Sequence, residues 1–250
     1  MVLSTPSKSQ SMIPFTSVRL HPLMFSDDSH YVIHAPKGRE SAIHLYMSSS
    51  LNMTAGEIFG GDLEGEGDET QGRGNLTGVG VIVGSDSRAV FYDGATVRGG
   101  NHLADALEVA DAPEFSTYYH SRKGGDAVVG LYFGSLITIK GGNFIGGRGP
   151  SMNGHSLHIA YEAQVYGGSF QGSFLARDRG AIVLHGCLSR VGNRLLGHLE
   201  QGDRVNLQIV EETGGAVIVE APKQIETCSK YKKKSSGESI RLGAFTVLKL

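Results

Sequence analysis

A Gly-Gly motif that recurs at a fixed spacing is the sequence feature that most restricts the fold. Residues 139–144 (IKGGNF) and 165–170 (VYGGSF) share the pattern hydrophobic-x-Gly-Gly-polar-Phe, and Val191 stands a further 26 residues along. Residues 58–63 (IFGGDL) and 97–102 (VRGGNH) are looser copies. Such a repeat in a chain rich in Gly, Val and Ile is typical of stacked coils. We predict an all-β fold: a single-stranded right-handed parallel β-helix (β-solenoid) with coils of about 26 residues and a C-terminal cap, its hand taken from the general preference of β-x-β connections.

The high glycine content supports a fold with many turns. The chain has 36 glycines among 250 residues, about twice the usual share. Only 7 prolines accompany them and no Gly-X-Y period occurs, which excludes collagen. We interpret the Gly-Gly pairs as corner residues, because glycine adopts positive φ without strain.

The two-residue alternation of apolar side chains predicts which positions stack inside the coils. We expect Leu131 and Phe133 to align with Leu157 and Ile159. The third equivalent is Val183/His185 or, after a one-residue slip, Ile182/Leu184. Phe144, Phe170 and Leu196 should likewise stack in the interior.

The pattern divides the chain into three parts. Residues 1–29 show no periodicity and are interpreted as an unstructured or leader-like tail. Residues 30–220 form the solenoid, with inserts near 64–75 and 103–123 where the spacing exceeds the regular step. Alternating runs at 205–210 and 216–219 predict a closing hairpin. Residues 221–250 are a basic tail with a terminal strand expected at 244–248.

The end of the repeat resembles a poorly characterised group of secreted or surface repeat proteins with a Gly-Gly-x-Phe parallel β-helix of pectin-lyase-like architecture. Their coils finish in a Gly-x-x-Leu-x-Gly-x-Leu-x-x-Gly segment, matched here by Gly192, Leu195, Gly197, Leu199 and Gly202. The similarity spans roughly residues 54–210. It implies an extracellular or cell-surface location and transfers no catalytic residue. The N-terminus lacks the compact apolar core of a signal peptide, so the compartment stays open.

The charge, hydropathy and cysteine content exclude some classes of partner and of fold. A net charge of −2 argues against nucleic acid, and the absence of a run of 18 apolar residues argues against a transmembrane helix. Cys187 and Cys228 are too few for a disulfide framework, and free thiols are the expectation, although the two could also pair. Asn52 and Asn75 begin glycosylation sequons that matter only if the chain is secreted.

Two groups of residues are candidate metal ligands. Asp62, Glu64, Glu66 and Asp68 alternate with other residues in a Gly-rich run, and carboxylate oxygens are the ligands that Ca²⁺ prefers. Their spacing matches neither an EF-hand nor the Gly-Gly-x-Gly-x-Asp nonapeptide repeat, so the preferred interpretation is a solvated acidic insert. His155 and His158 form a His-x-x-His pair, which we interpret as ordinary strand or surface histidines. Ca²⁺ is the one cofactor that the sequence suggests.

The sequence favours binding over catalysis. A glycoside hydrolase needs clustered carboxylates and a lyase needs a base with cations nearby, yet acids are sparse on the regular coils. We predict a non-catalytic surface or structural module that binds a polysaccharide or cell-surface component through Tyr132, Tyr166 and Arg190. The alternative is a small polysaccharide lyase or hydrolase that uses Asp178 with Arg177 or Arg179. A third alternative is a degenerate copy with no activity.

Overall fold

The computed structural model describes residues 23–25, 31–35, 41–62, 78–102, 123–131, 133–150, 152–201 and 203–221. Most of the predicted tail, both inserts, the basic segment and the expected strand at 244–248 lie outside these ranges. The described residues contain β-strands and no helix. The all-β part of the prediction is therefore confirmed.

Seventeen strands make up the described structure. They are β1 (Leu23–Phe25), β2 (Val32–His34), β3 (Ser41–Leu45), β4 (Ser50–Phe59), β5 (Val79–Val83), β6 (Arg88–Arg98), β7 (Val128–Gly130), β8 (Leu136–Ile139), β9 (Asn143–Ile145), β10 (Leu157–Ile159), β11 (Glu162–Val165), β12 (Ser169–Gln171), β13 (Phe174–Ala176), β14 (Ala181–Val191), β15 (Arg194–Leu199), β16 (Arg204–Glu211) and β17 (Ala216–Glu220).

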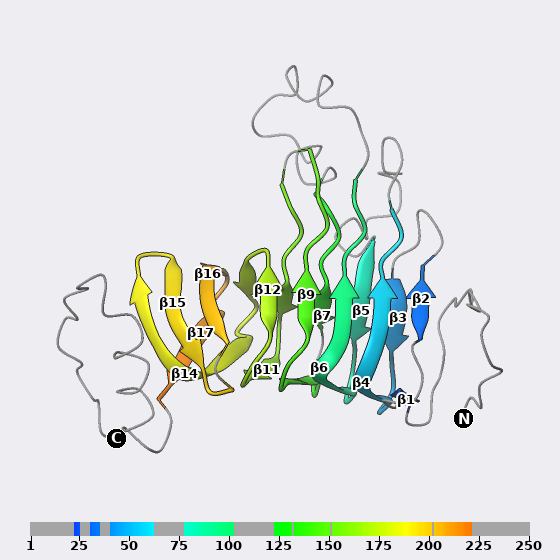
Figure 1. Ribbon diagram of the computed structural model, residues 1–250, viewed down its shortest axis with the longest axis horizontal. Helices are drawn as coiled ribbons and strands as arrows, with labels where there is room; N and C mark the ends of the chain where they lie inside the picture. The colour runs from blue at the N-terminus through cyan, green and yellow to red at the C-terminus, as the bar shows by residue number, and fades with distance from the viewer. Residues whose placement is uncertain are drawn as a thin grey trace.

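Three series of parallel pairs run along the long axis of the molecule (Figure 1). The first series is β1–β4–β6–β8–β11–β14–β17. The second is β3–β5–β7–β10–β13–β16. The third is β2–β4–β6–β9–β12. Shared strands and the hairpin described next join them into one sheet.

The C-terminal part of this sheet is antiparallel, which corrects the predicted architecture. Strand β15 pairs antiparallel with both β14 and β16, so the sheet is mixed, and it nearly closes on itself around the core as a barrel does. The reversal occurs at Gly192, whose φ of 57° suits the first position of a two-residue hairpin turn. The predicted single-stranded right-handed parallel β-helix with coils of about 26 residues is therefore wrong.

The register of the strands shows why the regular step failed. Ile139 pairs with Val165, 26 residues on, but Val165 pairs with Leu184 instead of Val191. Val191 is 62% exposed and pairs antiparallel with Arg194. A repeat in the sequence constrains the interior side chain of each strand, whereas the length of each connection sets the register.

Other details of the predicted stacking and cap also changed. Phe144 and Phe170 do pair, and their rings stack at 5.4 Å, as expected. Leu157 pairs with Val128 rather than Leu131, while Phe133 and Leu196 are exposed. Strands β16 and β17 exist where predicted but do not pair with each other as a hairpin; β17 pairs with β14, and β16 pairs with β13 and β15.

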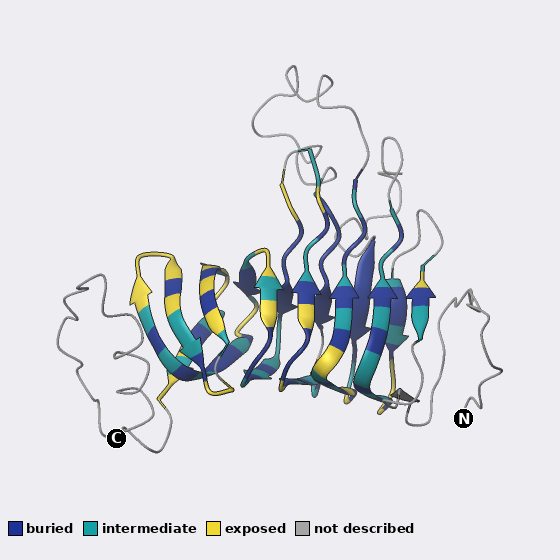
Figure 2. Ribbon diagram, viewed as in Figure 1, coloured by how far each residue is buried: buried dark blue, intermediate teal, exposed yellow. Residues whose placement is uncertain are grey.

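The core lies between the facing strands, whose inward side chains are buried along the length of the sheet (Figure 2). Alternating burial, as in β8 and β11, follows from the two-residue period of a strand. A row of aromatic rings fills part of this core: Phe91, Phe144, Phe170 and Phe174 contact one another in sequence with centroids 5.3, 5.4 and 4.8 Å apart. Offset and edge contacts between rings add to the stabilisation from burial.

Most Gly-Gly pairs have a structural role other than the predicted corner. Eight glycines lie where segments of backbone approach one another too closely for any side chain. A Cβ atom on any of them would collide with a neighbouring backbone carbonyl. We call this set the glycine bundle: Gly60, Gly99, Gly100, Gly124, Gly125, Gly146, Gly147 and Gly154. Their φ angles are not positive. Successive segments are joined by backbone hydrogen bonds of 2.8 Å from Gly125 to Gly100, Gly147 to Gly125 and Gly154 to Gly147.

The corner interpretation holds for the two best copies of the motif. Gly142 has a φ of 101° and Gly168 a φ of 109°, in the left-handed region that favours glycine. The same dipeptide therefore meets two different steric demands in this chain. The sequence pattern does not distinguish them.

Candidate functional site

A row of polar and aromatic side chains lies on the outer face of the first series of strands. Phe91, Ile139, Val165 and Leu184 are fully buried on consecutive strands, so the residue after each points outward. These four outward residues continue onto β17, where Glu220 pairs with His185. We call the five residues the outer row: Tyr92, Lys140, Tyr166, His185 and Glu220.

Neighbouring members of the outer row contact one another across the strands. Lys140 Nζ lies 5.1 Å from the centroid of the Tyr92 ring, a cation–π distance. The rings of Tyr166 and His185 stack at 4.1 Å with an interplanar angle of 3°. His185 also reaches Glu220 at 3.4 Å and Gln164 at 2.7 Å. These contacts restrict the side chains, which lowers the entropy that a ligand would have to remove.

A shallow hollow of about 480 Å³ opens at the Tyr92 end of the outer row. It is lined by Thr54, Ala55, Tyr92, Asp93, Gly94, Lys140 and Gln201. The Lys140 and Asp93 side chains are exposed, and neither forms an ion pair with another described residue. The hollow therefore presents a cation and a carboxylate that are not engaged in ion pairs among the described residues, together with an amide.

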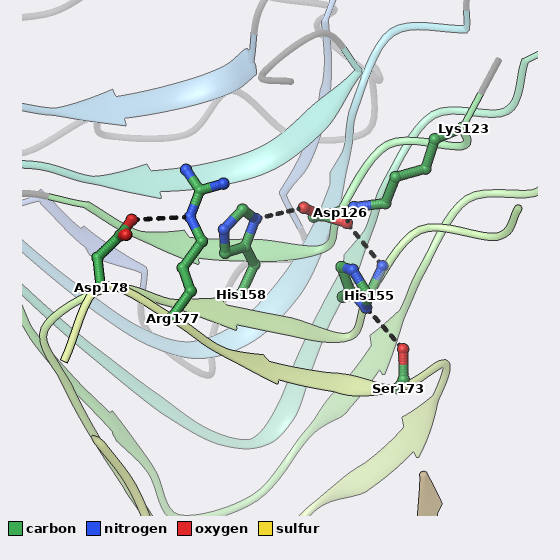
Figure 3. A network of polar contacts seen from close by, with 7 residues as sticks. All are labelled: Lys123, Asp126, His155, His158, Ser173, Arg177 and Asp178. Carbon is green, nitrogen blue, oxygen red and sulfur yellow. Dashed lines mark hydrogen bonds and ion pairs between the residues drawn. The ribbon is translucent and has the colours of Figure 1, made fainter. Parts of the chain in front are cut away.

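A second polar group is buried beneath the surface, between β7, β10 and β13 (Figure 3). We call Lys123, Asp126, His155, His158 and Ser173 the buried cluster. Asp126 is 1% exposed; its Oδ1 accepts from Lys123 Nζ and from the His155 backbone N–H, both at 2.6 Å. Its Oδ2 lies 2.8 Å from His158 Nδ1. The His155 ring contacts Ser173 Oγ at 2.6 Å.

The charge state of this cluster follows from its surroundings. Burial disfavours the Asp126 carboxylate, but the hydrogen bond from His158 and the Lys123 charge outweigh it and hold the pKa of Asp126 below its usual range. Burial is the main cause that lowers the pKa of His155 to about 4. Lys123, His158 and Arg177 lower this pKa further, whereas the Asp126 carboxylate raises it. At neutral pH, Asp126 is therefore charged and His155 is neutral.

The hydrogen bond to a charged Asp126 places the His158 proton on Nδ1. Its Nε2 atom is buried without a partner in the described structure. A buried polar atom without a partner is costly, so the rest of the cluster must hold this ring in place. The sequence alone identifies the two histidines as a pair. It did not identify Asp126 or Ser173. Asp126 follows the Gly124-Gly125 pair, as Asp62 and Asn101 follow theirs, and this position is the signal that could have found it.

Two of the three residues predicted to form a ligand face are described, and they lie on different parts of the sheet. Tyr166 is part of the outer row. Arg190 lies at the end of β14, where its guanidinium donates to both carboxylate oxygens of Glu211 at 3.2 and 2.8 Å. Tyr132 lies outside the described residues.

The residues of the alternative catalytic group occupy a tight turn. Asp178 and Arg179 both have positive φ, 52° and 67°. The Asp178 carboxylate lies 3.2 Å from Arg177 Nε and accepts a hydrogen bond of 3.0 Å from Thr213 Oγ1. These contacts engage Asp178 within the turn.

The acidic residue Asp62 has a structural partner. Its Oδ1 accepts the Asn101 backbone N–H at 2.7 Å, and Asn101 Oδ1 in turn accepts the Arg148 backbone N–H at 3.0 Å. Asp62 and Asn101, each the polar residue after a Gly-Gly pair, thus bridge to the next segment. Glu64, Glu66 and Asp68 lie outside the described residues, as does the Asn75 sequon, whereas Asn52 lies in β4.

Three further features bear on the sequence predictions. Within the described ranges, no three His, Cys, Asp or Glu side chains converge as a metal site. None of the described segments forms a helix suited to spanning a bilayer. Cys187 is disulfide-bonded, which corrects the expectation of a free thiol there. Cys228 lies outside the described residues.

Comparison with known proteins places the chain in no group. No family model, curated protein or solved structure matches it. Its function must therefore be argued from the outer row, the hollow and the buried cluster themselves.

Proposed function

We propose that the protein is a non-catalytic module that binds a polysaccharide along the outer row, with one sugar residue seated in the hollow. The observation that carries this proposal is the exposed pair of Lys140 and Asp93, which lack ionic partners among the described residues and flank Tyr92. Exposed charged groups without an ionic partner can exchange their hydrogen bonds with water for hydrogen bonds with a ligand.

The chemistry of the hollow suits a hydroxylated ligand. Each sugar hydroxyl both donates and accepts hydrogen bonds; Lys140 donates, Asp93 accepts and the Gln201 amide does both. Tyr92 supplies an apolar ring surface for the C–H groups of a sugar. Together these groups can satisfy the mixed surface of a neutral sugar residue.

The spacing of the outer row suits a linear chain of sugars. Neighbouring strands lie about 4.8 Å apart, which places Tyr92 and Tyr166 about 10 Å apart across β6, β8 and β11. That separation is about the length of a disaccharide. A polysaccharide that runs across the strands would therefore place sugar residues two apart against Tyr92 and Tyr166.

The presence of one carboxylate in the hollow favours binding rather than hydrolysis. Asp93 is the single carboxylate among the described residues that line it. Glycoside hydrolysis ordinarily uses two carboxyl groups on either side of the scissile bond. Asp178 belongs to a different part of the sheet, in the turn after β13.

Affinity electrophoresis against neutral and acidic polysaccharides tests the proposal. We expect retardation in at least one neutral polysaccharide, and we expect Tyr92→Ala and Lys140→Ala each to weaken it about 5- to 10-fold, as the loss of about 1 kcal/mol implies. Arg190→Ala is the matched control, because this exposed cation lies outside the row and should leave retardation unchanged.

Three outcomes would overturn the proposal. They are retardation in no polysaccharide, equal losses in Tyr92→Ala and Arg190→Ala, and release of shortened or unsaturated sugar products. The last result would show a lyase or hydrolase instead. Asp178→Ala would then be the first variant to assay.

A further inference from the structure

We propose that the buried cluster is an acid-sensitive lock, which holds the glycine bundle against strands β7, β10 and β13 and opens when His155 takes up a proton. The inference is independent of polysaccharide binding, because none of its residues belongs to the outer row or the hollow.

The buried cluster lies where the glycine bundle meets the starts of strands β7, β10 and β13, a place that we call the joint. Asp126 directly follows Gly124 and Gly125 and precedes β7; His155 directly follows Gly154 and precedes β10. Ser173 directly precedes β13. Strand β10 pairs in parallel with β7 and with β13, so the cluster spans three adjacent strands where they emerge from the bundle or a turn.

Most of the polar contacts that connect these segments go to one carboxylate, that of Asp126. Asp126 accepts hydrogen bonds from its own segment through Lys123 and from the β10 segment through the His155 backbone and the His158 ring. The His155 ring extends the connection to Ser173 (Figure 3). If His155 moves, the links between the three strands weaken together.

A further support is the balance of charge around His155. The charged groups that face it are Lys123, Asp126 and Arg177, with His158 a further titratable neighbour. Asp126 is the single acid among them and is already paired with Lys123. Arg177 is paired with Asp178 (Figure 3).

A proton on His155 would therefore add a cation to a buried site that has no free acid to receive it. The depressed pKa of His155, about 4, agrees with this geometry. Buried charge without a partner is relieved by local opening to water.

Hydrogen exchange followed by mass spectrometry tests the lock at pH 7, 5.5 and 4.5, with rates corrected for intrinsic exchange. In the wild type we expect peptides covering 123–131, 152–160 and 172–177 to lose protection at least about 10-fold at pH 4.5. A peptide covering β4 should keep its protection, because β4 lies outside the cluster.

Two variants separate the lock from a general effect of acid. His155→Gln cannot be charged but can still bond Ser173, so it should keep its protection at pH 4.5. His185→Gln changes a histidine of the outer row and should open like the wild type. Opening of His155→Gln at the wild-type pH would overturn the proposal, as would simultaneous loss of protection in β4.

A direct titration of the wild type covers the case in which His155→Gln does not fold. The imidazole Hε1 resonance of His155 should titrate well below pH 6, together with the loss of protection in the three peptides. Titration of His155 near its ordinary pKa of 6.5, with protection retained, would overturn the proposal.

Discussion

The carboxylates of Asp126 and Glu211 show how burial changes the value of an ion pair. Asp126 is 1% exposed and accepts hydrogen bonds from three donors. Glu211 pairs with Arg190 at the surface, where water and salt screen the attraction. The pKa of Glu211 is lowered by its hydrogen bonds to Arg190 and the Val217 backbone, but the pair remains largely solvated.

At this scale we predict that Asp126→Asn lowers the free energy of unfolding by about 3–5 kcal/mol, because it leaves the partly buried Lys123 ammonium without its counterion and removes the charge that the His155 and His158 donors face. Glu211→Gln should cost less than about 1 kcal/mol. Urea unfolding at pH 7 measures both. Equal losses in the two variants would show that the buried cluster does not stabilise the joint.

The glycine bundle decides how the connecting segments pack. Its backbones are linked directly by hydrogen bonds, with no space for a Cβ atom between them. This is the same steric demand that places glycine at the axis of the collagen triple helix, although the chain has no collagen period. The Asp62–Asn101–Arg148 bridges then add side-chain hydrogen bonds along the same segments.

Substitution of two glycines tests this role of the element. A Cβ at Gly125 would collide with the Gly78 carbonyl, so Gly125→Ala should cost about 3 kcal/mol or more through overpacking. A Cβ at Gly130 would meet the terminal methyl groups of Ile137 and Ile159, which can move aside. Gly130→Ala should therefore cost about 1 kcal/mol or less. Thermal and urea unfolding of the two variants should differ accordingly, and similar losses would contradict the close approach.

The stability of the whole molecule should depend on pH through His155. Its pKa is about 4 in the folded chain and 6.5 as the ordinary value, so between these values the unfolded chain binds more protons. Stability is therefore unaffected above pH 6.5 and falls as the pH decreases toward 4, by up to about 3 kcal/mol. Asp126 acts in the same direction at lower pH, because its pKa is also depressed on folding.

Urea unfolding at pH 7, 5.5 and 4.5 measures this dependence. His155→Gln should flatten the decrease between pH 6.5 and 4, whereas His185→Gln should leave it unchanged. A wild-type stability that stays constant or rises over this interval would contradict the assignment of a neutral, buried His155.

The sequence by itself determined features that depend on neighbouring residues. Strand type and inward positions follow from a two-residue alternation, which is why the strands at 205–210 and 216–219 and the pairing of Phe144 with Phe170 were predictable. The positive φ at Gly142 and Gly168 is likewise a local demand. Tyr166 could be recognised as outward because Val165 before it is apolar.

Only the tertiary structure decided the features that join distant segments. Connection lengths set the register, so Val165 meets Leu184, and the turn at Gly192 reverses the chain into an antiparallel pair. The glycine bundle and the buried cluster arise where separate segments approach, as Asp126 and His158 do across 32 residues. A pattern along one chain carries no record of these distances, because contacts between backbones depend on how the whole sheet curves around its core.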